Sequence, residues 1–404
     1  ADPTLLWKQG CDSSGCTTGF SDMGQTWSTP ISGDVRYLDD SGDLQTEQIV
    51  MFGGGFDDCL NEDVAAYPNG CDSAKGKAIY VLNAETGATL AKLVTEAPVI
   101  TGLSPIDIDF DGYIDFAYAA DVAGNLYRVN FALQGDANPS NLVSAVEIGE
   151  WDMVKIAAMS NDTRRFYNSP VAAAFSGTVV VTIGSGDRER PLEINYPYAT
   201  EVQNRLYALG DLPFKTFVAS TPDPDAGEVT TVDLDGSTMY AVVADPDPDN
   251  AFSPEVFNGW YFDLPDRGEQ VANPSAIGGG KVFFNTFQPG GVSTGICAKP
   301  KGIGTGYNVP LFSPVVPVAT PIAGGGIPIP PVIATVKIPP GLPPCDGVDC
   351  PVPPSPEDQC ASSADGCEVV TVCIGCNGFT PVEIVPDAPP TRKRMWFTEE
   401  IDSQ

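Results

Sequence analysis

Histidine is absent from the sequence, and this single absence excludes many kinds of catalytic site. Without it the chain can form no Ser-His or Cys-His nucleophile pair, no histidine-rich zinc or iron site and no imidazole general base. No stretch approaches the roughly 20 apolar residues that cross a bilayer, and no cationic, apolar-cored signal sequence opens the chain. We therefore expect a segment without a membrane span, either soluble or already processed.

Positive charge is also scarce. The 404 residues include 21 lysines and arginines against 53 aspartates and glutamates, which gives a formal net charge of −32. Such a surface repels phosphate backbones and anionic lipid headgroups, while the same long-range field attracts cations. The composition therefore argues against nucleic acid as a partner.

Helical periodicity is the third feature of which the sequence has little. Apolar residues rarely recur at helical spacing for more than two turns, whereas β-branched and aromatic runs bounded by Gly, Asn, Asp and Pro recur throughout. Four runs place an aromatic residue in a short apolar strand that ends in a polar turn: KAIYVLNAETGATLAKL, GNLYRVNFA, NRLYALGDLP and GWYFDLPDRGEQV. We expect one large all-β domain built as a radial array of small sheets, a β-propeller, with an ordinary β-sandwich as the alternative.

The eleven cysteines stand mostly in short, close pairs, several of them in Gly-, Asp- and Pro-rich loops. The pairs are Cys11 and Cys16, Cys59 and Cys71, Cys345 and Cys350, Cys360 and Cys367, and Cys373 and Cys376. This usage is typical of local disulfides in an oxidising compartment; the connectivity stays open, and Cys297 is left over. A zinc site is the alternative, because VCIGC at 372–376 is a CxxC motif, but the spacings do not repeat and the loops are acidic.

The segment DIDFDGYID, residues 107–115, carries the clearest chemical signal. Its carboxylates occupy positions 1, 3, 5 and 9, a glycine occupies position 6, and position 7 offers a backbone carbonyl. The residues concerned are Asp107, Asp109, Asp111, Gly112, Tyr113 and Asp115. This is most of the calcium-loop pattern, and Ca²⁺ suits an all-oxygen cage better than Mg²⁺ or a softer metal does.

The match to the calcium-loop pattern is incomplete at position 12, where Tyr118 replaces the bidentate glutamate of a helix-loop-helix site. We therefore expect an EF-hand-like loop between two strands. Four ionised carboxylates within ~5 Å of one another would repel by roughly 3 kcal/mol per close pair at an effective dielectric constant of about 20. A solvated acidic turn is the alternative, but the full set of four positions with the glycine favours calcium.

Residues 111–131, DGYIDFAYAADVAGNLYRVNF, closely resemble the signature of the C-terminal β-propeller of the PilY family of type IV pilus tip-associated proteins. Further segments resemble the family in the same order: LLWK, IYVLNAETG, RRFYNSPVAAAFSGTVVVTIGSGDRERPL, NRLYALGD, GWYFDLPDRGEQVANPSAIGGGKVFFNTFQP and RKRMWFTEE. The resemblance implies a modified seven-bladed propeller. It also carries the calcium-ligand role onto Asp107, Asp109, Asp111, the Tyr113 carbonyl and Asp115.

The same resemblance divides the chain into three parts. Residues 4–340 would form the blades, because AGGGIPIPPVIATV in the proline-rich tract is similar to a family segment that forms strands of the late blades. Residues 341–380 contain six cysteines and depart from the family as a Cys/Pro-rich insertion or loop. Residues 381–404 would return as a strand that, with the opening strand, closes the ring.

For function, the resemblance implies a non-enzymatic, calcium-binding propeller of the pilus tip complex, with calcium occupancy tied to pilus extension and retraction. Its partners would be minor pilins, and its location would be extracellular after export through the periplasm. In the family, adhesion to a host or abiotic surface belongs to a variable N-terminal region that is not contained in this sequence.

Two alternative functions stay open. One is a propeller like that of the pyrroloquinoline quinone- and calcium-dependent dehydrogenases, and the other is a purely structural calcium-stabilised scaffold. Three features argue against the dehydrogenase. The sequence has no adjacent cysteine pair and no tryptophan-docking motif that repeats from blade to blade, and its aspartates lie together in one local loop.

Overall fold

The computed structural model describes most of the chain. The described residues are 4–61, 71, 74–134, 143–160, 164–175, 178–187, 189, 202–211, 231–245, 249, 251–253, 256–290, 301–338, 368–376 and 378–383. Within them nearly all of the regular secondary structure is strand, which confirms the all-β prediction. The two helical segments of this part of the chain are single 3-10 turns, η1 (Asp58–Asn61) and η2 (Ile148–Glu150), and neither is long enough to cross a bilayer.

Five sheets of three to five strands, named I to V here, follow one another along the chain, except that one strand of sheet II, β16, lies within the stretch that forms sheet III. Sheet I has the order β3 (Ile31–Leu38), β4 (Leu44–Gly53), β5 (Ala78–Asn83), β6 (Thr89–Val94). Sheet II has the order β16 (Val232–Asp233), β12 (Asp152–Ala158), β9 (Asn125–Asn130), β8 (Phe116–Ala120), β7 (Ser104–Ile106). Sheet I and the β7, β8, β9 and β12 part of sheet II are antiparallel, whereas β16 runs parallel to β12.

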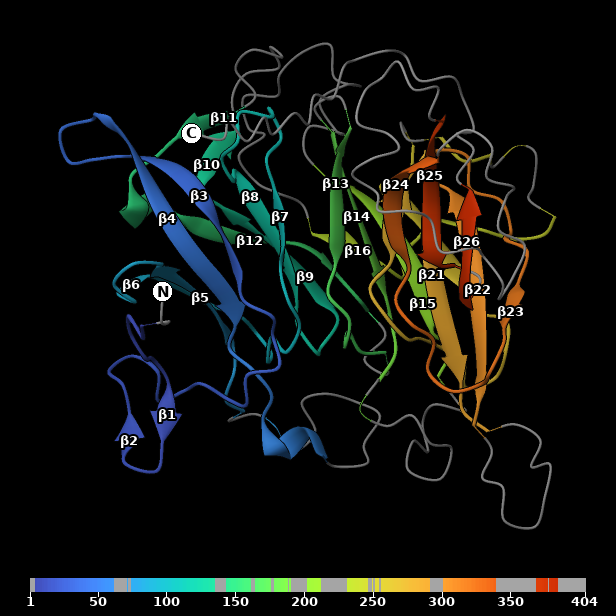
Figure 1. Ribbon diagram of the computed structural model, residues 1–404, viewed down its shortest axis with the longest axis horizontal. Helices are drawn as coiled ribbons and strands as arrows, with labels where there is room; N and C mark the ends of the chain where they lie inside the picture. Colours follow the sequence, from blue (N-terminus) through green and yellow to red (C-terminus); the bar gives the residue numbers. More distant parts are fainter. Residues whose placement is uncertain are drawn as a thin grey trace.

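The remaining three sheets continue the series. Sheet III has the order β13 (Val171–Phe175), β14 (Thr178–Gly184), β15 (Arg205–Asp211), β18 (Gly259–Asp263), β17 (Met239–Ala241). Sheet IV has the order β19 (Gln270–Val271), β21 (Lys281–Gln288), β22 (Ile303–Pro310), β23 (Thr320–Ile322), and β20 (Ala276–Gly278) also pairs with β21. Sheet V consists of β24 (Val332–Ile338), β25 (Glu368–Gly375) and β26 (Gly378–Glu383). In Figure 1 the series runs from sheet I on the left to sheets IV and V on the right.

Neighbouring sheets pack face to face, and β8 shows how its sequence makes this possible. All five residues of FAYAA are buried. Phe116 and Tyr118 point into a core shared with sheet III, while Ala117 and Ala119 point into a core shared with sheet I. Because successive side chains of a strand face opposite sides, an uninterrupted apolar run fits a strand that is covered on both faces. Stacked small sheets of this kind are the arrangement of propeller blades.

The aromatic runs seen in the sequence lie on strands within these sheets. Tyr80 lies on β5 of sheet I, Tyr127 on β9 of sheet II, and Tyr207 on β15 of sheet III. The fourth run contributes β18 and its buried Trp260, and β18 is the antiparallel neighbour of β15. Two of the four runs therefore share one sheet. The aromatic run identifies interior strands of the sheets, but the number of runs does not equal the number of blades. The count of seven blades and the closure of the ring stay predictions.

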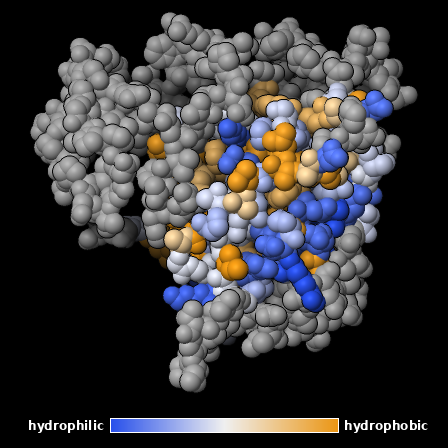
Figure 2. Space-filling model, turned by 90° about the vertical axis from the view of Figure 1, so that its right-hand side faces the viewer, coloured by the Kyte–Doolittle hydropathy of each residue, from blue (hydrophilic) through white to orange (hydrophobic). Residues whose placement is uncertain are grey.

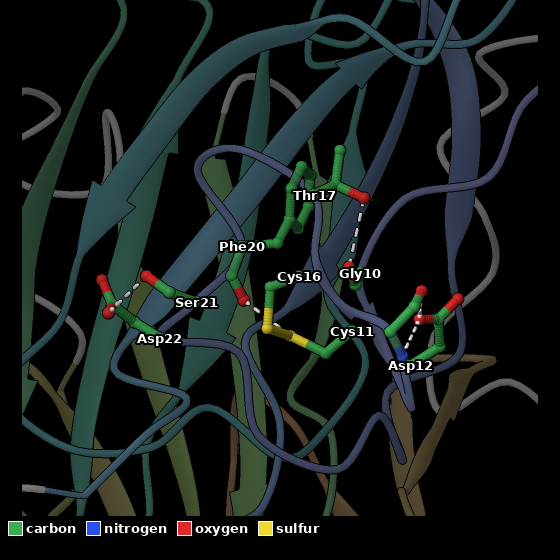
Figure 3. Close-up of a disulfide and its surroundings, with 9 residues drawn as sticks. Gly10, Cys11, Asp12, Cys16, Thr17, Phe20, Ser21 and Asp22 are labelled. Atoms are coloured by element: carbon green, nitrogen blue, oxygen red, sulfur yellow. Dashed lines mark hydrogen bonds between the residues drawn. A yellow bond between two sulfur atoms is a disulfide. The ribbon is translucent and has the colours of Figure 1, made fainter.

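The N-terminal hairpin of β1 (Cys11–Asp12) and β2 (Gly15–Cys16) stands apart from the five sheets, and a second short pair consists of β10 (Ala132–Gln134) and β11 (Val143–Ala145). A disulfide joins Cys11 to Cys16, and the Thr17 hydroxyl beside it donates to the Gly10 carbonyl at 3.1 Å (Figure 3). Further disulfides join Cys59 to Cys71 and Cys373 to Cys376. The predicted use of cysteine in local pairs is thus confirmed for these six residues, whereas Cys297, Cys345, Cys350, Cys360 and Cys367 lie outside the described residues.

The C-terminal third of the chain adds detail to the predicted boundaries. β23 and β24 are strands of sheets IV and V, so the proline-rich tract contributes to the sheets. β25 lies inside the 341–380 segment and pairs along its length with β24. β26 spans the predicted boundary at residue 381, and residues 384–404, where the closing strand was predicted, lie outside the described residues.

Figure 2 shows the face on the right-hand side of Figure 1, where apolar side chains lie in separate areas among hydrophilic ones. Large apolar side chains that are exposed around β22 to β24 include Phe312, Val315, Val318 and Val332. Single exposed apolar residues are ordinary on protein surfaces, so they need no functional explanation.

Candidate metal centre

The aspartate loop, residues 107–115, connects β7 to β8 at the edge of sheet II. The two strands pair antiparallel, and Ile106 opposite Phe116 closes the base of the loop. The Asp115 amide donates to the Ile106 carbonyl at 2.9 Å, and the Asp115 carbonyl accepts from the Phe131 amide at 2.9 Å. Both ends of the loop are therefore fixed by backbone hydrogen bonds, as expected for an EF-hand-like loop between strands.

Hydrogen bonds within the loop fold it back on its first carboxylate. Asp107 accepts from the amides of Asp111, at 3.1 Å, and Gly112, at 2.8 Å. Gly112 has a φ of +94°, which a residue without a Cβ adopts without strain. The sharp bend that the glycine at position 6 predicts is therefore present. Phe110 has a φ of +60° and an exposed side chain, and it marks the outer tip of the turn.

Three of the predicted ligands come together in this turn. Asp107, Asp109 and Asp115 each offer a carboxylate oxygen, and these oxygens lie within 4.8 Å of one another. Asp115 is only 3% exposed and accepts from the Ile108 amide at 2.9 Å through Oδ2. Asp109 Oδ1 is buried and accepts no hydrogen bond from any described residue. A buried carboxylate oxygen without a donor is costly unless a cation compensates for it.

The carboxyl groups of the cluster titrate in a low-dielectric, acidic environment. Burial raises the pKa of the Asp115 carboxyl to about 7, the negative charges of the other three aspartates add to this rise, and the Ile108 amide opposes it. Burial likewise raises the pKa of Asp109, with contributions from Asp111 and Asp107, while the positive charge of Arg36 opposes this rise. Both shifts show that the protein disfavours ionised carboxylates here unless positive charge lies close to them.

The fourth aspartate, Asp111, lies apart from this cluster. One of its carboxylate oxygens forms an ion pair with Arg36 on β3 of sheet I. The other accepts from the Tyr113 amide at 3.0 Å. The guanidinium of Arg36 also lies over the Tyr113 ring, 5.0 Å from its centroid. The structure thus brings three of the four predicted carboxylates together and pairs the fourth with an arginine.

The loop is also docked on β3 through its backbone and an apolar side chain. The Ile114 amide donates to the Asp34 carbonyl at 2.8 Å. A Cβ placed on Gly33 would lie 2.5 Å from Ile114 Cδ1, so glycine lets the loop approach this strand closely. Sequence reasoning did not identify this contact with sheet I, nor the role of Arg36. No local signal exists for either, because 75 residues separate Arg36 from Asp111 and only the packing of the sheets joins them.

The donor set fits a hard divalent cation. All candidate side-chain ligands in the loop are carboxylates, one of their oxygens is buried without a donor, and the cluster contains neither nitrogen nor sulfur. Calcium binds through six to eight oxygens, so three carboxylates would require further oxygens from Asp111, from backbone carbonyls or from water. The carbonyl of Tyr113 stays a predicted ligand.

A scan against protein-family models finds no match for this chain. A search of curated proteins finds a type IV pilus biogenesis factor PilY1 homolog from Xylella fastidiosa, 24% identical over 252 residues. That alignment covers 56% of this chain and 16% of the relative, so the chain spans about a sixth of the length of the curated relative that it matches. The match confirms the resemblance to the PilY family that the sequence motifs indicate.

Among solved structures, the chain is similar to the C-terminal domain of Pseudomonas aeruginosa PilY1. The TM-score is 0.46 and the identity 16%, over 73% of this chain and 60% of that domain. It is also similar to the quinohemoprotein alcohol dehydrogenase of Comamonas testosteroni, with a TM-score of 0.37 and 11% identity, over 90% of this chain and 45% of the enzyme.

Proposed function

We propose that this chain is a calcium-binding, non-enzymatic propeller of a type IV pilus-associated protein, and that residues 107–115 hold the ion. The observation that carries the calcium proposal is the convergence of Asp107, Asp109 and Asp115 around a buried carboxylate oxygen that lacks a donor. The pilus proposal rests on the family signature that begins within this loop and on the resemblance to a PilY1 homolog.

Each loop residue would have a distinct part in binding. Asp107 is held by two amides of the turn, so its carboxylate is oriented before an ion arrives. Asp115, which immediately precedes β8 and is fixed through its backbone, would supply a buried oxygen, while Asp109 would supply the oxygen that accepts no hydrogen bond. Bound calcium would supply the positive charge that allows these carboxylates to stay ionised together.

In the pilus, the propeller would act as a calcium-dependent binding module. Its partners would be minor pilins of the tip complex, outside the cell, and calcium occupancy would bias the pilus between extension and retraction. We propose no catalytic step for the chain. Support of surface adhesion or motility would follow from this position in the pilus.

Calorimetric titration of chelator-treated protein with calcium chloride tests the metal site. We expect one calcium ion per chain, and we expect Asp109→Asn to weaken binding by about tenfold or more, because it removes a charged ligand. Asp245→Asn is the matched control, since Asp245 is an exposed aspartate outside the loop. Absence of binding by the wild-type chain at millimolar calcium would refute the site.

A pull-down of minor pilins with the wild-type chain, in calcium and in EGTA, tests the pilus role. Calcium-dependent capture is expected, and Asp109→Asn should reduce it. Capture that is equal in both buffers would favour the structural scaffold, in which calcium stabilises the fold without controlling a partner.

A further inference from the structure

The position of Asp111 distinguishes it from the other aspartates of the loop. Asp107, Asp109 and Asp115 already lie within reach of a common ion, whereas the Asp111 carboxylate is engaged by the guanidinium of Arg36. The partner comes from a different sheet, because Arg36 lies on β3 and the loop belongs to sheet II.

Arg36 is held in this position by a contact of its side chain and by the docking of its strand on the loop. Its guanidinium lies over the Tyr113 ring, and the neighbouring backbone of β3 accepts a hydrogen bond from the Ile114 amide at Asp34. The side chain of Arg36 is 31% exposed and that of Asp111 26%, so the pair is partly shielded from water. A planar guanidinium above an aromatic ring and beside a carboxylate is an arrangement that lysine cannot reproduce.

Calcium and Arg36 would therefore compete for the same carboxylate. Calcium needs six to eight oxygens, and Asp111 is the remaining side-chain carboxylate of the loop. We infer that Arg36 is a built-in competitor that lowers the calcium affinity of the loop, and that calcium binding transfers Asp111 from the guanidinium to the ion. The inference rests on the calcium site proposed above and names the residue that regulates it.

This transfer would couple calcium occupancy to the contact between sheets I and II. Before binding, the Arg36–Asp111 pair joins β3 to the loop. After binding, the loop would be held by the ion, and the guanidinium would keep its contact with the Tyr113 ring and water. The loop would exchange a contact with sheet I for a contact within sheet II, which makes the interface of the two sheets sensitive to calcium.

The test is calorimetric calcium titration of chelator-treated wild-type, Arg36→Gln and Arg36→Lys chains, together with their thermal unfolding in calcium and in EGTA. Releasing Asp111 and removing one positive charge should make Arg36→Gln bind calcium about tenfold more tightly. Arg36→Gln should unfold at a lower temperature than the wild type in EGTA, and calcium should raise its unfolding temperature by more. Arg36→Lys, which keeps the charge and loses the planar donor, should fall between the two.

Lys92→Gln is the matched control. Lys92 lies on β6, at the edge of sheet I opposite to β3, and its ammonium pairs with Asp22 at 2.8 Å. This variant therefore removes one positive charge, as Arg36→Gln does, without changing a contact of the loop. If the wild-type chain binds calcium and Arg36→Gln binds it with the same affinity, the competition is refuted and the calcium site is retained. The same conclusion follows if Lys92→Gln changes the calcium affinity as much as Arg36→Gln does. A merely structural Arg36 would lower the unfolding temperature equally in both buffers. Absence of calcium binding by the wild-type chain would refute the site and the competition together.

Discussion

Replacing Asp109 by asparagine should separate two contributions to the free energy of unfolding. One is the repulsion among the carboxylates in the absence of calcium, and the other is the stabilisation that bound calcium provides. The carboxylate oxygens of Asp107, Asp109 and Asp115 lie within 4.8 Å of one another. At that separation two ionised carboxylates repel by ~3 kcal/mol at an effective dielectric constant of about 20. An amide at position 109 removes one charge and can donate hydrogen bonds to its two neighbours, so Asp109→Asn should be more stable than the wild type in EGTA.

Calcium should reverse this order. An ion present at about 100 times its dissociation constant stabilises the folded state by about 2.7 kcal/mol. With an unfolding entropy of about 2.1 cal/mol/K per residue, a chain of 404 residues gains about 1 °C in Tm for each kcal/mol. We therefore expect calcium to raise the wild-type Tm by about 3 °C, and the Asp109→Asn Tm by about 1.5 °C or less if that variant binds calcium at least tenfold more weakly.

Differential scanning calorimetry of both proteins in EGTA and in calcium measures the four values, with Asp245→Asn as the control for the loss of one negative charge. Two results would refute the reasoning. One is an Asp109→Asn protein that is less stable than the wild type in EGTA and gains as much from calcium. The other is a calcium-induced shift in the wild type that Asp107, Asp109 and Asp115 variants do not alter.

Three further predictions concern pH, the core and catalysis. The pKa of Asp115 is about 7 in the folded chain, against an ordinary value of 3.8. The folded chain therefore keeps this proton up to a higher pH than the unfolded chain does. The free energy of unfolding in EGTA should then fall as pH rises from about 4 to 7, which a lower Tm would show. Asp211→Asn, which removes the charge paired with the buried Arg128 and weakens the acceptor of the Tyr118 hydroxyl, should cost about 3–5 kcal/mol by urea unfolding, whereas Asp22→Asn at the surface should cost far less. The purified chain given quinone and calcium should show no dye-linked alcohol oxidation, and sustained oxidation would contradict the non-enzymatic proposal.

The sequence predicts what depends on neighbouring residues and misses what depends on packing. The spacing of the aspartates predicts that their carboxylates converge, and those of Asp107, Asp109 and Asp115 do lie close together, because a turn of nine residues with a glycine at its bend leaves few other arrangements. Their role as ligands stays a prediction. The same spacing assigns Asp111 to the ion, whereas the structure pairs it with Arg36. Which charge lies beside the loop depends on how sheet I packs on sheet II, and no local pattern contains that information.

The strands follow the same division between local and long-range information. The FAYAA run is recognisable as a strand, and the structure explains why no polar face accompanies it: one side contacts sheet I and the other contacts sheet III. The aromatic runs identify interior strands, but two of them share sheet III, so counting them does not count blades. Strand pairing across long separations depends on contacts that short sequence windows do not contain.

The apolar residues on either side of the aspartates explain how one ion could act on two interfaces. Ile108 is buried in the core between sheets II and III, while Ile114 packs against the core between sheets I and II. Between them lie Asp109 and the bend of the loop, and just beyond Ile114 lies Asp115. An ion that fixes these carboxylates relative to one another also fixes the separation of the two apolar anchors. Because each anchor belongs to a different core, the binding free energy of calcium would be shared between two sheet interfaces and would not stay within the loop.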